Sequence, residues 1–210
     1  MGKPGKMSWI ERLRRTASAT INPRDPSAVL ATAAVAGRRR TAGLLAASIL
    51  GRPAPSGIQD ARPKSPSLDD TLLAAAAGCG PIPDPPSAGG PAPMLPRSPD
   101  DVIEVWTETE LSAVHAAWGV AGWRDAAERS AIWLVDEIQP DNATNLPWAV
   151  HVFADLGERE GRADLTMYAN TLLHNCIVGS GRPDGLSALI LLDAAAQLER
   201  SGSSGPVDLR

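Results

Sequence analysis

The sequence predicts an all-α fold whose helices lie in the C-terminal half of the chain. Between Thr109 and Ser201 the apolar residues recur every three to four positions, and no segment shows a clean two-residue alternation. Glycines and prolines separate these periodic segments, as is typical of turns between helices. We therefore expect about five helices, packed as consecutive antiparallel hairpins.

Each of the five helices is expected from its own apolar stripe and its own terminator. Gly119, Pro140 and Gly179 mark three of the ends, because proline interrupts a helix and glycine favours the residue after its last turn. The fifth segment is apolar nearly all round, which indicates a central position. The segments span residues 111–118, 123–138, 147–157, 165–178 and 186–200.

The N-terminal half is expected to be largely disordered. Fifteen of the 19 prolines precede residue 101, and 12 of them lie between Arg52 and Asp100. That density disfavours both helix interiors and sheet ladders, and it leaves little apolar surface to offset the loss of chain entropy. We expect a basic arm with short amphipathic helices over 1–51, a disordered linker over 52–100, the helical domain over 101–200, and a flexible tail over 201–210.

Charge is divided unevenly along the chain. Residues 1–64 carry 12 basic and three acidic side chains, whereas residues 101–210 carry seven basic and 17 acidic ones. A basic arm of this kind can contact its own acidic domain or an anionic surface. The short amphipathic segment from Trp9 to Arg15 suits an anionic membrane surface. Arginine greatly exceeds lysine, which fits a GC-rich coding sequence and disfavours nucleic acid as the partner.

The expected location is the cytoplasm, with export as the alternative. No apolar run approaches the ~18 residues that a membrane-spanning helix needs. The arginines at 38–40 precede a short apolar run, as in an export signal, and Ala76 to Cys79 resemble a lipoprotein cleavage site. These two segments leave a secreted or lipid-anchored protein as open alternatives.

The segment from Pro140 to Phe153 is the most informative part of the sequence. Its polar residues precede Pro147, which suits the first turn of a helix, and Asn145 is the expected cap of a helix that begins near Leu146. These side chains are most simply turn and cap residues, and the alternative is that they line a binding site. The residues of that candidate ligand site are Asp141, Asn142, Asn145, Trp148, His151 and Asp155.

A histidine and a carboxylate on the third expected helix are the best candidates for chemistry. His151 and Asp155 are four residues apart and share a helix face, so Asp155 is placed to orient His151 as a base. No nucleophile motif accompanies them. The spacing of His115, His151, His174 and Cys176 matches no metal-binding motif, so neither a metal nor a cofactor is expected.

The resulting functional expectation is a helical interaction or scaffold domain that binds a protein partner without catalysis. The absence of a nucleophile, metal or phosphate-binding motif favours this interpretation. The alternative is a small enzyme or ligand-binding protein of helical-hairpin type, with a polar and aromatic site over residues 141–151.

Overall fold

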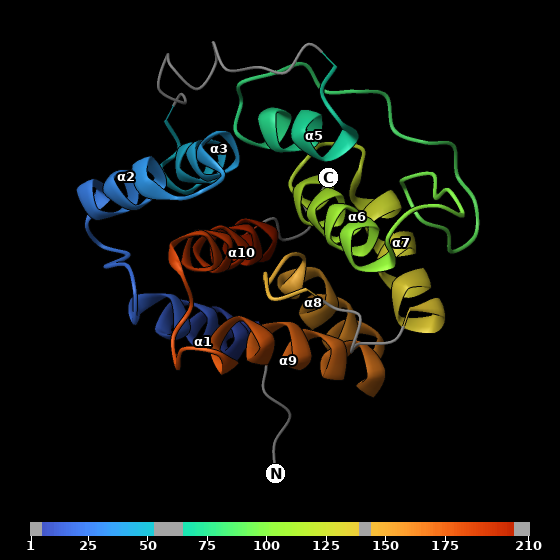
Figure 1. Cartoon of the computed structure of the whole chain (residues 1–210). Helices are drawn as coiled ribbons and strands as arrows, with labels where there is room; N and C mark the ends of the chain where they lie inside the picture. Colours follow the sequence, from blue (N-terminus) through green and yellow to red (C-terminus); the bar gives the residue numbers. More distant parts are fainter. Residues whose placement is uncertain (1–5, 53–64, 139–143, 204–210) are drawn as a thin grey trace, which may run out of the picture.

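The computed structural model describes residues 6–52, 65–138 and 144–203, and these contain nine helices and no strand (Figure 1). The all-α prediction is therefore confirmed for this part of the chain. The first four helices are α1 (Lys6–Ser18), α2 (Pro26–Val35), α3 (Arg39–Leu50) and α5 (Leu68–Ala76). The other five are α6 (Ile103–Trp118), α7 (Arg124–Glu137), α8 (Val150–Glu160), α9 (Ala163–Val178) and α10 (Gly185–Ser203). These last five correspond one by one to the helices expected from apolar periodicity.

Helix α10 lies at the centre of the molecule (Figure 1). It contacts α1, α2, α3 and α8, and almost every residue from Leu186 to Leu198 is buried. An amphipathic helix buries one stripe, whereas a helix that is apolar all round must be covered on every side. The central position expected for this segment is confirmed.

The expectation of a disordered N-terminal half is wrong for the described residues. Trp9, Ile10 and Leu13 of α1 are buried, and α1 packs along α10. In α3, Leu44 and Leu45 are buried in the same core, so the apolar run that resembles an export signal is part of the fold. Local sequence reading missed this because α1, α2 and α3 are stabilised by burial against α10 rather than by their own propensity.

The segment from 65 to 100 is also ordered, although it carries only one helix. Its proline carbonyls still accept hydrogen bonds, and tryptophan side chains of the helical half donate them. The Nε1 of Trp123 donates to the Pro83 carbonyl at 2.8 Å, and that of Trp106 donates to the Pro96 carbonyl at 3.2 Å. The expected disorder is thus wrong for residues 65–100, while 53–64 and 204–210 lie outside the described residues.

The hairpin arrangement places α8 and α9 in close contact. Gly157 of α8 makes this possible, because a Cβ built at this position would lie 2.9 Å from the backbone nitrogen of Thr166. Helices α6 and α7 form a second consecutive pair, joined by a turn in which Gly122 has a φ of +80°. Among the described residues, no helix is long and apolar enough to cross a membrane.

Candidate functional site

Three helices bring four polar side chains together in the interior. His115 comes from α6, His151 from α8, and Asp193 and Gln197 from consecutive turns of α10; all four are buried. We call these four residues the histidine core. The two imidazole centroids are 4.7 Å apart, and the ring planes are nearly perpendicular. Buried polar groups of this kind are costly unless they bond to one another.

Asp193 is the main hydrogen-bond acceptor of the histidine core. Its Oδ2 accepts hydrogen bonds from His115 Nε2 at 2.9 Å and from Gln197 Nε2 at 2.7 Å. Its Oδ1 accepts one from the hydroxyl of Ser48, on α3, at 2.6 Å. Burial alone would raise the pKa of Asp193, but the hydrogen bond and the electrostatic interaction with His115, together with the hydrogen bonds from Ser48 and Gln197, outweigh burial and lower it to about 2. The carboxylate is therefore ionised at neutral pH.

The backbone fixes the tautomer of His115. The N–H of Ala149 donates to His115 Nδ1 at 3.2 Å, so the ring proton sits on Nε2 and is donated to Asp193. Ala149 has a φ of +57° and is, within the described ranges, the only non-glycine residue with a positive φ. Such a conformation costs about 1–2 kcal/mol and needs support from its surroundings. The hydrogen bond to His115 provides part of that support.

His151 is a buried imidazole with one ring nitrogen left open. Gln197 directs its amide nitrogen at Asp193, so its Oε1 accepts from His151 Nε2 at 3.2 Å. The Nδ1 of His151 has no partner among the described residues. Burial, followed by the proximity of His115, lowers the pKa of His151 well below its ordinary value of 6.5. The ring is thus neutral at neutral pH.

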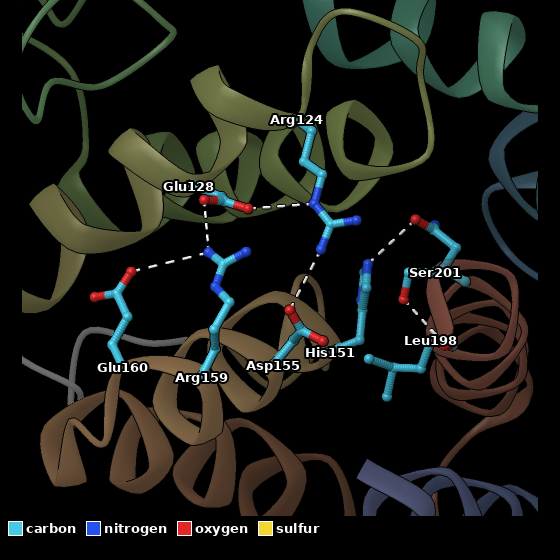
Figure 2. Close-up of polar contacts among 9 residues, drawn as sticks. Arg124, Glu128, His151, Asp155, Arg159, Glu160, Leu198 and Ser201 are labelled. Carbon is cyan, nitrogen blue, oxygen red and sulfur yellow. Dashed lines mark hydrogen bonds and ion pairs between the residues drawn. The ribbon is translucent and has the colours of Figure 1, made fainter. Parts of the chain in front are cut away.

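The expected pairing of His151 with Asp155 is wrong. Asp155 instead accepts from Arg124 of α7 at 3.4 Å, and Arg124 also contacts Glu128 at 3.2 Å (Figure 2). Arg159 continues this ion network to Glu128 at 2.6 Å, which ties α7 to α8 at the surface. The shared helix face was predicted correctly, but Asp155 lies near its exposed edge, where an arginine competes for the carboxylate.

Arg124 also closes the histidine core from outside. Its guanidinium lies 3.9 Å from the ring centroid of Trp118, and Trp118 meets the ring of His151 edge-on at 6.0 Å. Figure 2 shows Arg124 reaching from α7 towards Asp155, beside His151. The stacked arginine and tryptophan therefore separate the imidazole of His151 from solvent.

The predicted turn residues take different roles from those expected. Helix α8 begins at Val150 rather than near Leu146, and no side chain caps it. The side chain of Asn145 is exposed, and it is the hydroxyl of Thr144 that accepts from the Leu146 N–H at 3.2 Å. The cap prediction for Asn145 is wrong because the chain makes an additional turn at residues 147–149 before the helix starts. Asp141 and Asn142 lie outside the described residues.

Trp148, one of the candidate residues predicted from the sequence, lies beside the histidine core. It is completely buried, and its ring meets His115 edge-on at 5.2 Å. Sequence reasoning missed Asp193, Gln197 and Ser48, which complete the cluster. The sequence did contain a signal for two of them. Asp193 and Gln197 are polar residues four positions apart in the most apolar helix, and such residues need partners from neighbouring helices.

The chemistry open to this cluster is limited by its bonding. The Ser48 hydroxyl donates to Asp193 and not to a histidine, so it is not activated as a nucleophile. His174 is exposed on α9, and the described residues hold no group of three histidine, cysteine, aspartate or glutamate side chains placed to bind a metal. Compared with known proteins, the chain matches no family model, no curated protein and no solved structure.

Proposed function

We propose that this chain is a non-enzymatic helical protein that binds a protein partner through a groove between α5 and α6. One observation carries the proposal: Val102 and Val105, at the start of α6, are 61% and 66% exposed and line the same open hollow of about 600 Å³. We call this hollow the α5–α6 groove. Its lining residues are Ser67, Leu68, Leu95, Pro96, Asp100, Asp101, Val102, Val105, Trp106 and Thr109.

The lining of the α5–α6 groove defines the chemistry of its partner. The valines, with Leu68 and Leu95, give an apolar floor, and among the described residues the charged ones in the lining are Asp100 and Asp101. Apolar anchors set into a groove provide most of the affinity of a helical or extended segment, and charges at the rim set its orientation. The complementary partner is an amphipathic segment with apolar anchors and lysines or arginines beside them.

The bonding of the histidine core supports a binding function rather than catalysis. Asp193 is occupied by three donors from within the protein, and Arg124 stacks over the tryptophan beside His151. Buried groups paired in this way rigidify a core and specify its arrangement. The core would then hold α3, α6, α8 and α10 in register beneath the surface that binds.

A synthetic helical peptide of leucine and lysine tests the proposal on the full chain. We expect saturable binding, measured by fluorescence anisotropy. The affinity should weaken about tenfold or more with Val105→Asp, because a carboxylate in the apolar floor would have to lose its water when the peptide binds. Val178→Asp is the matched control, since Val178 is 63% exposed on α9 outside the groove. A leucine and glutamate peptide should bind far more weakly.

Two results would contradict the proposal. Equal loss of binding with Val105→Asp and Val178→Asp would show that the peptide adheres to exposed apolar surface in general. Equal affinity for the lysine and glutamate peptides would remove the role assigned to Asp100 and Asp101.

A second candidate function is the binding of a small hydroxyl-bearing ligand at the histidine core. The observation that favours it is the presence of three buried polar atoms without partners among the described residues: His151 Nδ1, Trp118 Nε1 and Trp148 Nε1. A neutral hydroxyl group can donate to the imidazole and accept from an indole, which matches this set. Access requires Arg124 to leave Trp118, because that contact closes the core.

Arg124→Ala separates the second candidate from the first. If the core admits ligands, the variant should gain affinity for simple sugars, seen as shifts of the His151 nitrogen resonances in long-range ¹H–¹⁵N spectra. Arg129→Ala, on the same helix, is the control. Unchanged His151 resonances in both variants at high sugar concentration would exclude the ligand site.

A further inference from the structure

A second hollow is lined by the end of α1 and by the turn that follows it towards α2. In Figure 1 this turn lies on the opposite side of the molecule from α5 and α6. Its volume is about 610 Å³. We call it the arginine pocket. Its lining residues are Arg14, Arg15, Ser18, Asn22, Pro23 and Arg24.

The loop that forms one wall of the arginine pocket is fixed at several points. Ile21 is buried in the core, and the hydroxyl of Thr20 donates to the Pro183 carbonyl at 2.5 Å. The side chain of Asn22 accepts from the Arg24 N–H at 3.1 Å, which closes a local turn. The backbone that carries Arg24 is thus held in place before any ligand arrives.

The charges of the arginine pocket are not balanced from within. Arg14 pairs with Glu199 of α10 at 2.7 Å, but Arg15 and Arg24 have no carboxylate partner among the described residues. Among the described residues, the lining contains three guanidinium groups and no acidic side chain. Like charges gathered around one hollow repel one another, and a bound anion relieves that repulsion.

We propose that the arginine pocket binds a phosphate group. A phosphate has three or more oxygens, so it can contact several guanidinium forks at once, whereas a carboxylate offers only two oxygens. The hydroxyl of Ser18 and the amide of Asn22 add neutral polar groups to the lining. The inference is independent of the proposed partner groove, because the two sites share no residue.

The phosphate group has two possible sources with the same chemistry. One is a soluble phosphate monoester, and the other is the headgroup of an anionic lipid. The membrane contact expected for Trp9 to Arg15 is changed by the structure, since the apolar side of α1 is buried against α10 and only its arginine side faces outwards. A lipid would therefore be held by its headgroup and not by insertion of this helix.

Titration calorimetry of the full chain tests the proposal with inorganic phosphate and glycerol 3-phosphate as probes. Vesicles of phosphatidylcholine, with and without phosphatidic acid, form the second arm in a sedimentation assay. The double variant Arg15→Ala/Arg24→Ala should weaken binding at least tenfold. Arg39→Ala is the control, because Arg39 is an exposed arginine of α3 outside the pocket.

The arms of the experiment separate the two sources. Saturable binding of the soluble probes that the double variant loses and Arg39→Ala keeps supports a soluble phosphate monoester. Binding only to vesicles with phosphatidic acid, again lost only in the double variant, supports a lipid headgroup. No saturable binding in either arm, or equal weakening by Arg39→Ala, overturns the phosphate site.

Discussion

Asp193 and Glu110 are both buried carboxylates with three hydrogen-bond donors, yet their pKa values shift in opposite directions. Asp193 accepts from side chains of three helices, and its pKa falls to about 2. Glu110 accepts from the Ser130 hydroxyl and from the backbone N–H groups of Met94 and Leu95. At Glu110, burial outweighs these bonds and raises the pKa above 4.5.

The difference shows that a count of donors does not decide the direction in which the pKa of a buried carboxylate shifts. At Asp193 the hydrogen bonds and the electrostatic interaction with His115 exceed the cost of desolvation, whereas at Glu110 the hydrogen bonds do not. Asp193 therefore acts as a fixed charge at the centre of four packed helices. Glu110 holds the extended segment before α6 against the helical half.

The largest expected effect is that of Asp193→Ala. The change leaves the buried donors of His115 and Gln197 without an acceptor, so we expect the free energy of unfolding to fall by about 3–5 kcal/mol. Urea denaturation measures it. Glu199→Ala, at an exposed position of the same helix, should cost about 1 kcal/mol or less. A loss below 1 kcal/mol for Asp193→Ala would remove its assigned role.

Glu110→Ala should have a smaller effect and a local signature. Loss of the carboxylate leaves two backbone N–H groups unpaired, and we expect the free energy of unfolding to fall by about 1–3 kcal/mol. Hydrogen exchange should quicken at the amides of Met94 and Leu95 while the amides of α10 keep their relative protection. Uniform quickening throughout the protein would instead show that Glu110 is a general core residue.

The pH dependence sharpens the comparison through His151. Because the folded pKa of His151 lies below 6.5, the unfolded chain binds more protons as the pH falls below 6.5. The stability that the neutral ring contributes is present above pH 6.5 and is lost on acidification, by about 1.4 kcal/mol per pH unit at most. His151→Gln should flatten this slope between pH 6.5 and 5, whereas His174→Gln, at an exposed site, should retain it.

The two carboxylates should respond to acid with opposite signs. The stability from Asp193 is present above its ordinary pKa of 3.8 and is lost as the pH falls towards 2. The stability from Glu110 is present below its ordinary pKa of 4.5 and is lost as the pH rises through its raised folded value. Relative to wild type, Glu110→Gln should therefore cost less stability at high pH than at low pH. The difference between variant and wild type, followed by urea denaturation across pH, gives the sign directly.

The smallest expected effect is that of Asn145→Ala. The side chain is exposed and caps no helix, so the free energy of unfolding should change by about 0.5 kcal/mol or less. Thr144→Val is the comparison, because it removes the hydroxyl that bonds to both the N–H and the carbonyl of Leu146. Thermal melts that show a greater loss for Asn145→Ala than for Thr144→Val would restore the cap function first expected for Asn145.

Sequence reasoning predicted the helical half of the fold because its information is local. Apolar periodicity identified α6 to α10 and the central position of α10, as a stripe or its absence reflects the number of covered faces. Short helices were expected in the N-terminal arm, but the order of this half was missed, because most of the prolines lie between α3 and α6. The proline count does not indicate the surface that α10 offers to α1.

The candidate site was predicted only in part because its partners come from distant positions. Trp148 and His151 were found from the turn that precedes them, and both are in the interior cluster. The partner of His151 is 46 residues away in the sequence, and that of His115 is 78 residues away. Helix spacing can place Asp155 beside His151, but it cannot indicate that Arg124 and Gln197 compete for these groups.

The packing of α1 on α10 has a consequence for biosynthesis. The two helices carry an ion pair between residues 185 positions apart, so the helix against which α1 mainly packs is absent until α10 has emerged. At the usual rates of translation this delay lasts about ten to forty seconds. During that time the nascent chain exposes an apolar helix face to the ribosome surface and to chaperones. Its final compaction is therefore a post-translational event, governed by the slow closure of distant contacts.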